Sequence, residues 1–435
     1  GPLLEPRFVQ RFARGLARWA KQRHSDKAAR LHAIIGRDTR GSGEAIFHHL
    51  AQGLGDEGIG VLDGGICPTP AVATAVRDLN LELGLVITAS HNPASDNGIK
   101  VFGSSGAKLS DASEREIEAE IAATMATALR VGGTPVRQYE ARRHYLEALA
   151  GILPEGALMG LSIVVDASNG ATFQTTAELL AKLGARITRI HHTPDGANIN
   201  ADCGSEHPAS LQATVLETTA DIGIAHDGDG DRVILCDHAG EVINGDALLA
   251  LLALHWAKQG WLTHGGLVAT VMSNLALDAT LRQHGIHVHR AGVGDRQVFF
   301  KMRDLGLHLG GESSGHIISL RHLPTGDGLL AALLVLRAMT DTGQTLRDLA
   351  SVYTPYPQLV RNLKVTSKPD LVELGDLQSA LRDLEADLGD EGRLLLRYSG
   401  TEPKIRLLVE AGDPDRARHA MDRLYQIVTA HLPVI

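Results

Sequence analysis

The chain has few cysteines and few aromatic residues. Its three cysteines, Cys67, Cys203 and Cys236, contain no CxxC pair and are odd in number. A disulfide framework or a cysteine-based zinc site is therefore not expected, and a reducing compartment fits. Aromatic side chains make up only 4% of the residues, which argues against a stacking surface for single-stranded nucleic acid.

Long apolar runs and runs of one charge sign are also missing. No stretch approaches the roughly 18 apolar residues of a membrane-spanning helix, and the N-terminus lacks the apolar core of a signal peptide. The shorter runs Ala247–Trp256 and Leu329–Leu336 predict buried helices. The net charge of −9, with both signs interspersed, disfavours nucleic acid and anionic membranes as partners. These features predict a cytoplasmic protein.

A pattern of strands and helices repeats three times along the first three quarters of the 435-residue chain. In each repeat an apolar run leads into a helical pattern that ends near a glycine (Gly58, Gly184 or Gly285), and a second and a third apolar run follow. The first runs are Ala33–Gly36, Ser162–Val165 and Leu267–Thr270; the second are Ile59–Leu62, Ala185–Ile190 and Ile286–Val288; the third are Leu83–Ile87, Asp221–Ala225 and Leu305–Leu309.

This alternation predicts an α/β fold of three similar domains with mixed sheets, although the ordinary rhythm of any α/β protein is an alternative explanation. The remaining residues predict a smaller α+β domain, with strands at Lys364–Thr366, Arg393–Arg397 and Ile405–Val409 and helices at Leu377–Leu388 and Asp413–Ala430. We place the domains at residues 1–137, 138–237, 238–354 and 355–435.

A polar loop follows the third apolar run of every repeat. Because ligands of such sheets gather at the carboxyl ends of strands, we expect these loops to surround a central cleft. The loops are Thr88–Pro93, Asp227–Arg232 and Gly311–His316, and a fourth polar turn, Arg397–Pro403, lies in the last domain.

Three carboxylates alternate with glycine in the second loop, at Asp227, Asp229 and Asp231. This spacing places them on one side of an extended turn, and clustered oxygen donors favour Mg²⁺ or Ca²⁺. An EF-hand is excluded because its sixth and twelfth positions would be Arg232 and His238 instead of glycine and glutamate. A solvated acidic turn is the alternative.

The other loops carry hydroxyls and cations suited to phosphate. Ser90 follows an apolar strand, and a phosphorylated serine there would add anionic oxygens to a metal site; a helix cap is the alternative. Lys100 could stabilise transferring charge, or it could be a surface lysine. The fourth turn combines arginines with hydroxyls and turn amides, a combination typical of an anion site, with a simple turn as the alternative.

Taken together and in this order, these loops resemble the α-D-phosphohexomutase family over essentially the whole chain, and most closely its bacterial members that act on glucosamine phosphate. The segments that carry the resemblance are Ala89–Pro93, Asp96–Lys100, Asp227–Val233, Val293–Arg296, Thr325–Gly328, Arg397–Pro403 and Ile405–Arg406.

The resemblance implies a reaction in which phospho-Ser90 interconverts glucosamine 6-phosphate and glucosamine 1-phosphate through a hexosamine 1,6-bisphosphate, which also activates the enzyme. It further implies one Mg²⁺ per chain, a place in amino-sugar nucleotide and cell-wall precursor synthesis, and a monomer or homodimer. The metal ligands would be Ser90, Asp227, Asp229 and Asp231; the catalytic residues Ser90, His91, Lys100, Arg232, His316 and Arg40; and the substrate-binding residues Gly294, Asp295, Glu312, Ser314, Arg397, Ser399, Gly400, Thr401 and Arg406.

One part of the family pattern has no counterpart in the chain. Family members begin with a segment of the type Gly-Thr-Asp-Gly-Ile-Arg-Gly, whereas this chain begins with Gly1-Pro2 and lacks that strand and its arginine. We interpret the chain as processed or incomplete. A phosphoglucomutase or phosphomannomutase, an inactive sugar-phosphate-binding homologue and a Mg²⁺-dependent phosphatase are the alternative functions.

Overall fold

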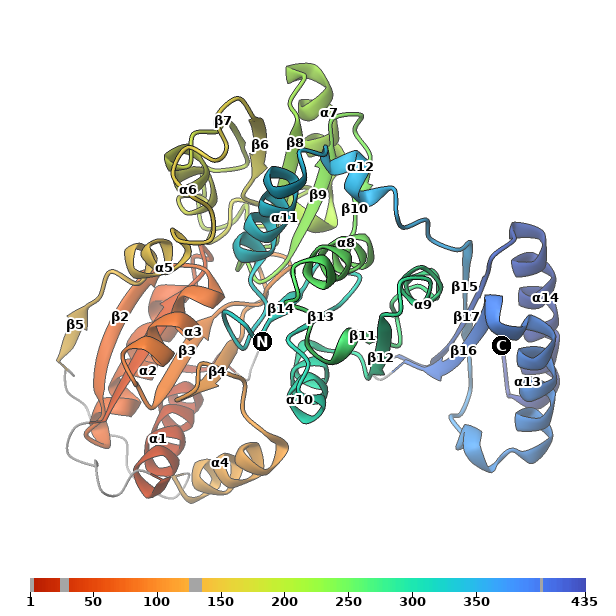
Figure 1. Ribbon diagram of the computed structural model, residues 1–435. Helices are drawn as coiled ribbons and strands as arrows, with labels where there is room; N and C mark the ends of the chain where they lie inside the picture. Colours follow the sequence, from red (N-terminus) through yellow and green to blue (C-terminus); the bar gives the residue numbers. More distant parts are fainter. Residues whose placement is uncertain (1–3, 24–30, 125–134, 400–401) are drawn as a thin grey trace. The chain divides into compact units, whose positions relative to one another are not determined.

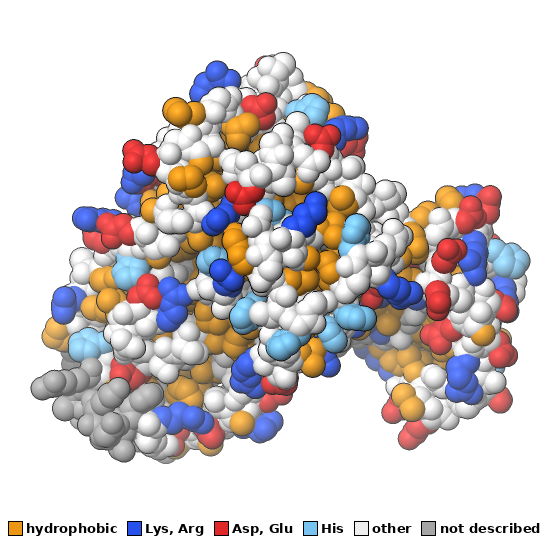
Figure 2. Space-filling view, in the orientation of Figure 1, with side chains coloured by type: hydrophobic (Ala, Val, Ile, Leu, Met, Phe, Trp, Pro, Cys, Tyr) orange, Lys and Arg blue, Asp and Glu red, His pale blue; other side chains and the backbone are white. Residues whose placement is uncertain are grey.

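The computed structural model describes residues 4–23, 31–124, 135–399 and 402–435. The chain divides into two compact units, one formed by residues 1–271 and 289–350 and the other by residues 272–288 and 351–435 (Figure 1). Within the described ranges, no helix has both the length and the apolar character that a membrane crossing requires. Figure 2 shows acidic and basic side chains interspersed over the visible surface, as the sequence predicts.

The first sheet has the strand order β4-β3-β1-β2-β5. Strand β1 pairs in parallel with β2 and β3, β2 pairs in parallel with β5, and β4 runs antiparallel to β3. The strands are β1 (His32–Arg37), β2 (Gly60–Ile66), β3 (Leu83–Ile87), β4 (Ile99–Gly103) and β5 (Val136–Gln138). The helices are α1 (Pro6–Arg23), α2 (Gly43–Asp56), α3 (Thr69–Asp78), α4 (Asp111–Thr124) and α5 (Ala141–Leu149).

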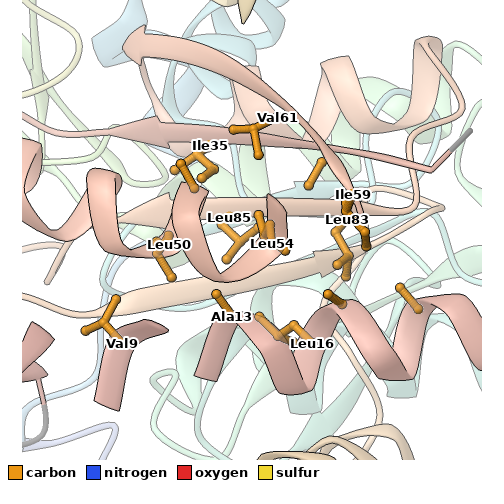
Figure 3. Close-up of a cluster of buried hydrophobic side chains, with 14 of the residues drawn as sticks. Val9, Ala13, Leu16, Ile35, Leu50, Leu54, Ile59, Val61, Leu83 and Leu85 are labelled. Atoms are coloured by element: carbon orange, nitrogen blue, oxygen red, sulfur yellow. The ribbon is translucent and has the colours of Figure 1, made fainter. Parts of the chain in front are cut away.

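Apolar side chains of α1 and α2 cover one face of this sheet (Figure 3). The two helices approach closely at Gly53, where a Cβ would lie 2.3 Å from the backbone oxygen of Gln10. Burying one large aliphatic side chain stabilises the fold by about 1.5–3 kcal/mol, so α1 contributes strongly to this core. The buried side chains include Val9, Ala13, Leu16, Ile35, Leu50, Leu54, Leu83 and Leu85.

The second sheet repeats the arrangement of the first, with the order β10-β9-β8-β6-β7. Strand β6 pairs in parallel with β7 and β8, and β9 runs antiparallel to β8, as β4 does to β3. The strands are β6 (Ser162–Asp166), β7 (Arg186–Ile190), β8 (Ile222–His226), β9 (Val233–Asp237) and β10 (Val242–Ile243), and the helices are α6 (Thr176–Lys182) and α7 (Ala209–Thr218).

The third sheet is shorter, with the order β12-β11-β13-β14. Its strands are β11 (Gly266–Thr270), β12 (His287–Ala291), β13 (Leu309–Gly311) and β14 (Ile317–Ser319). The helices of this part of the chain are α8 (Gly245–Lys258), α9 (Ala276–Arg282), α10 (Asp295–Leu305), α11 (Gly328–Thr342) and α12 (Leu346–Ala350). The apolar runs predicted as buried helices lie in α8 and α11, which confirms that prediction.

The second unit contains an antiparallel sheet with the order β15-β17-β16. Its strands are β15 (Gln358–Lys364), β16 (Gly392–Tyr398) and β17 (Lys404–Ala411), and its helices α13 (Gly375–Leu388) and α14 (Pro414–His431) pack their apolar faces against the sheet. Asp413 accepts hydrogen bonds from the amides of Asp415 and Arg416, which confirms the predicted start of the last helix.

Three α/β repeats followed by a smaller α+β domain are therefore confirmed, but two predicted strands are wrong. Leu305 is the last residue of α10, and the third repeat's strand begins only at Leu309, because the left-handed Gly306 ends the helix there (φ 66°). The strand predicted at Lys364–Thr366 ends at Lys364 and extends from Gln358, where alternate residues face the helices.

Candidate active site

The loops after β3 and β8 meet in the first unit. Ser90 lies in the loop after β3, and Asp227 directly follows β8. The Ser90 hydroxyl donates a hydrogen bond to Asp227 Oδ2 over 2.5 Å, although the residues are 137 positions apart. The third loop joins them through backbone contacts, since the Val233 amide donates to Gly315 O at 3.0 Å. The predicted convergence of the three loops is therefore present in this unit.

The carboxylates of Asp227, Asp229 and Asp231 form a buried cluster, with ligand oxygens within 4.8 Å of one another. Lys100 pairs with Asp229 Oδ2 at 2.5 Å and with Asp231 Oδ2 at 2.6 Å, and the Thr69 hydroxyl donates to Asp229. Lys100 contacts two of the three carboxylates directly. The burial of the cluster contradicts the alternative of a solvated acidic turn.

This cluster fits a divalent cation. Asp229 Oδ1 is buried and has no hydrogen-bond partner among the described residues, and Asp231 Oδ1 is buried with a long contact of 3.5 Å to His316 Nδ1. A buried carboxylate oxygen without a partner is costly, and a bound cation would remove that cost. Oxygen donors of this kind suit Mg²⁺, which commonly keeps further positions for water or phosphate.

Mutual repulsion and burial shape the ionisation of the cluster. Burial, together with the charges of Asp231 and Asp229, raises the pKa of Asp227 well above its usual range. Burial also acts to raise the pKa of Asp231, but the charges of Lys100 and His316 outweigh it and lower that pKa well below its usual range. The cluster therefore favours a positive ligand beside Asp227.

The Ser90 loop has a constrained backbone. Ser90 has a φ of 52°, a left-handed conformation that costs a residue other than glycine roughly 1–3 kcal/mol. Its amide donates to Thr88 Oγ1 at 2.9 Å, and the Thr88 hydroxyl donates to Asp38 Oδ2 at 2.7 Å. These bonds tie the loop to the end of β1.

Arg40 contacts the same loop through its guanidinium group. Its side chain is completely buried, and its Nε donates to Asp38 Oδ2 at 2.9 Å. Its other four N–H groups donate to the carbonyl oxygens of Pro93, Asp96, Ser90 and Asn92. All five donors of the guanidinium are used in this way. The resemblance implies a catalytic role for Arg40, and these contacts show that its guanidinium holds the Ser90 loop.

Two further predicted residues, His91 and Arg232, lie beside the acidic cluster. The Arg232 amide donates to Asp227 Oδ1 at 3.2 Å, and its guanidinium contacts Glu206 at 3.2 Å. Partial burial and the charge of Arg232 lower the pKa of His91, so its imidazole is neutral at pH 7. A neutral imidazole can accept a proton.

His316 is buried next to the carboxylate cluster. Its Nδ1 lies 3.5 Å from Asp231 Oδ1, and its Nε2 lies 3.7 Å from Asp295 Oδ2. Burial acts to lower the pKa of His316, but the charges of Asp231 and Asp295 outweigh it and raise that pKa. Asp295 in turn pairs with Lys108. His316 therefore supports Asp231 electrostatically.

The predicted sugar-binding residues lie in one neighbourhood. Glu312 Oε1 accepts a hydrogen bond from the Gly294 amide at 3.0 Å, which joins the loop after β13 to the start of α10. Asp295 follows Gly294 directly, and Ser314 is half-buried in the same loop as Glu312. This arrangement offers carboxylate and hydroxyl groups to a polar ligand.

In the second unit, two arginines share one face of the sheet. Arg397 of β16 lies directly opposite Arg406 of β17, and neither forms an ion pair among the described residues. Ser399 is buried, and its Oγ accepts a hydrogen bond from the Glu402 amide at 3.3 Å. Paired guanidinium groups suit a phosphate. Gly400 and Thr401, which were also predicted to bind substrate, lie outside the described residues.

Sequence reasoning missed three side chains that hold this site together. Thr69 donates to Asp229, Asp38 anchors both Arg40 and Thr88, and Asn200 donates to the carbonyl oxygens of Ser90 and Asn92. Asp38 could have been suspected because it lies two residues after an apolar run, as Asp227 does. Nothing in the sequence singles out Thr69 or Asn200.

Models of one protein family match most of the chain. The three α/β/α domains of the phosphoglucomutase/phosphomannomutase family match residues 1–128, 143–240 and 244–356, as domains I, II and III, and its C-terminal domain matches residues 361–427.

Similar proteins and solved structures agree with this family match. Phosphoglucosamine mutase from Ruegeria sp. (strain TM1040) is 44% identical, over 94% of this chain and 92% of its own length. Phosphoglucosamine mutase from Clavibacter sepedonicus is 41% identical, over 100% of this chain and 97% of its own length. A phosphoglucomutase/phosphomannomutase family protein from Burkholderia thailandensis shares the fold, with a TM-score of 0.82 and 24% identity over 99% of this chain and 95% of that one.

The fold also matches N-acetylphosphoglucosamine mutase from Aspergillus fumigatus, solved with GlcNAc-6P and magnesium. The TM-score is 0.61, with 19% identity over 83% of this chain and 91% of that one. At these identities the solved structures show the fold, whereas the closer sequence relatives show the family. The chain therefore belongs to the phosphoglucomutase/phosphomannomutase family and is an α-D-phosphohexomutase, an isomerase most similar to phosphoglucosamine mutases.

Proposed function

We propose that this phosphohexomutase interconverts glucosamine 6-phosphate and glucosamine 1-phosphate, with Ser90 carrying the transferred phosphoryl group. The observation that carries the proposal is the 2.5 Å contact between Ser90 Oγ and Asp227 Oδ2 at the edge of the buried carboxylate cluster. The choice of amino sugar follows the phosphoglucosamine mutases to which the chain is 41–44% identical.

The reaction consists of two phosphoryl transfers. In the first, the P–O bond of phospho-Ser90 breaks, a new P–O bond forms to a free sugar hydroxyl, and the proton that this hydroxyl loses ends on the released Ser90 Oγ. The product is a hexosamine 1,6-bisphosphate. After the sugar reverses its orientation, the other sugar P–O bond breaks and its phosphoryl group forms a bond to Ser90 Oγ, and the proton that Ser90 loses ends on the released sugar oxygen.

Charge stabilisation is the main task of the site in such a transfer. Asp227, Asp229 and Asp231, with an oxygen of phospho-Ser90, would hold Mg²⁺, which when bound supplies positive charge near the transferring oxygens. Lys100 is a second cation: burial acts to lower the pKa of Lys100, but the charges of Asp229 and Asp231 outweigh it and raise that pKa, so it stays protonated.

The remaining residues take roles in proton movement and binding. Neutral His91 would exchange the hydroxyl proton, and Arg232 and His316 would balance charge around the cluster. Glu312 and Ser314, with Gly294 and Asp295, would bind sugar hydroxyls in either orientation. The phosphate that does not react would be held by Arg397, Ser399, Gly400, Thr401 and Arg406.

The setting of the reaction is part of the proposal. We place the enzyme in the cytoplasm, as a monomer or homodimer that acts in amino-sugar nucleotide and cell-wall precursor synthesis. A trace of hexosamine 1,6-bisphosphate would prime it by phosphorylating Ser90.

The test compares three substrates at one enzyme concentration, with Mg²⁺ and a trace of the matching 1,6-bisphosphate. We expect glucosamine 6-phosphate to be turned over far faster than glucose or mannose 6-phosphate, almost no free phosphate to be released, and Ser90→Ala to abolish turnover. A clear preference for glucose or mannose phosphate would contradict the amino-sugar assignment. Phosphate release that matches substrate loss would indicate a phosphatase instead.

A further inference from the structure

Side chains from two different α/β domains hold the loop that carries Ser90. Asn200 lies between β7 and α7, and its Nδ2 donates to the carbonyl oxygens of Ser90 at 2.8 Å and Asn92 at 2.9 Å. Arg40 donates to the same two oxygens at 3.0 and 2.8 Å. Each carbonyl oxygen therefore accepts two hydrogen bonds, as many as its two lone pairs allow.

We propose that Asn200 is a positioning residue for phosphoryl transfer: it aligns the Ser90 hydroxyl with the carboxylate cluster by clamping the Ser90 loop against the second domain. The inference rests on the proposed role of Ser90 as phosphoryl carrier. Asn200 itself does not touch the reacting atoms, so its effect passes through the backbone of Ser90 and Asn92.

The backbone around the clamp explains why it is needed. Ser90 has a φ of 52°, so its loop would relax toward ordinary geometry if nothing held it. Arg40 and Thr88 hold the loop to its own domain, through Asp38 at the end of β1. Asn200 is the side chain that ties the Ser90 and Asn92 carbonyls to the domain that carries Asp227.

The Asn200 side chain also lies directly against the loop Asp227–Arg232. A Cβ at Gly228, between Asp227 and Asp229, would lie 2.6 Å from the carbonyl oxygen of Ser90 and 2.8 Å from Asn200 Nδ2. The missing side chain at Gly228 lets the two loops approach. Both hydrogens of the Asn200 amide are used. An aspartate at position 200 would therefore place a carboxylate against two carbonyl oxygens, with no proton to donate.

The backbone of Asn200 allows a clean test. Its φ is 59°, where glycine is unstrained, so Asn200→Gly removes the amide without adding backbone strain. Asn200→Asp keeps the size of the side chain but replaces its donor with an acceptor. Asn80 is a matched control, because it has a φ of 52° and is exposed at the end of α3.

We would measure kcat and KM for glucosamine 6-phosphate, and the rate at which hexosamine 1,6-bisphosphate phosphorylates Ser90. Rates are given per mole of folded protein, at a temperature below the melting transition of every variant. Misalignment of about 1 Å costs up to roughly 100-fold in rate, so Asn200→Gly and Asn200→Asp should lower kcat and the phosphorylation rate by about 10–100-fold. KM should change by less than about threefold, because ground-state binding is retained. Asn80→Gly should leave both parameters unchanged.

A kcat for Asn200→Gly within about twofold of the wild-type value would overturn the proposal. So would an effect confined to melting temperature, or a rise in KM alone. Glucose and mannose 6-phosphate are assayed in parallel. If the wild-type protein prefers one of them, the proposed substrate is wrong, and the role of Asn200 is then decided by the same comparison on that sugar.

Discussion

Lys100 is the residue on which the charge balance of the carboxylate cluster depends. Its ammonium contacts Asp229 and Asp231, and these contacts oppose the repulsion among three buried carboxylates. The same repulsion, added to burial, raises the pKa of Asp227. A protein without Lys100 or a divalent cation would have to protonate these carboxylates or open the site.

Lys100→Met keeps the side chain's length and removes its charge. Breaking a buried ion pair by removing one partner costs about 3–5 kcal/mol, so we expect a large drop in melting temperature in EDTA that Mg²⁺ partly reverses. Lys182→Met, which removes an exposed pair with Glu178, is the control and should cost less than about 1 kcal/mol. An unchanged melting temperature for Lys100→Met in EDTA would contradict this account of the cluster.

At the scale of elements, local signals in the sequence predicted part of the helices and strands, and α1, which packs against the first sheet, was not among them. Asp413 could be predicted as a helix cap because the cap bonds form within the next few residues. The apolar runs in α8 and α11 are buried except for the half-buried Leu254, so composition sufficed there. Strand β15 was misplaced because its residues alternate between a packed and an open face, which makes its apolar signal weak.

Asp327, which caps α11, gives a prediction at this scale. Its Oδ1 accepts hydrogen bonds from the Leu330 amide at 2.9 Å and from Tyr145 Oη at 2.6 Å, while its buried Oδ2 has no partner in the described part of the chain. Burial raises the pKa of Asp327 from 3.8 to about 6. The folded state thus binds this proton more tightly than the unfolded state.

The stability that this proton supplies is fully present below pH 4 and is lost as the pH rises from about 4 through about 6. Asp327→Asn keeps the cap but cannot ionise. Urea unfolding should therefore show the variant gaining stability relative to the wild-type protein between pH 4.5 and 7.5, with a change of at most about 3 kcal/mol. A difference that stays constant with pH would show that Asp327 has an ordinary pKa.

At the scale of the whole molecule, the threefold repeat predicted which loops carry the chemistry but not the contacts that join them. The hydrogen bond between Thr69 and Asp229 spans 160 positions, and that between Asn200 and the Ser90 carbonyl spans 110. Such contacts depend on how separate domains pack against each other, and no local pattern encodes that packing. Arg40 could be named from the sequence only because it matches a position of the family. Its complete burial could not be predicted, because it also depends on long-range packing.

The division into two units with separate apolar cores predicts two unfolding transitions in calorimetry. The carboxylate cluster lies entirely within the first unit, so Mg²⁺ should raise the midpoint of one transition and leave the other unchanged. Asp229→Asn is a suitable control, since it should remove the shift. A single transition, or an equal shift of both, would contradict independent stability of the units.

The central claim is that Ser90 passes its phosphoryl group to a hexosamine phosphate. The most direct measurement is a single-turnover experiment in which enzyme labelled with radioactive phosphate on Ser90 is mixed with unlabelled glucosamine 6-phosphate and Mg²⁺. We predict that the label leaves Ser90 and appears in hexosamine bisphosphate and then in glucosamine phosphate. Label that stays on Ser90, or that appears as inorganic phosphate, would contradict the claim.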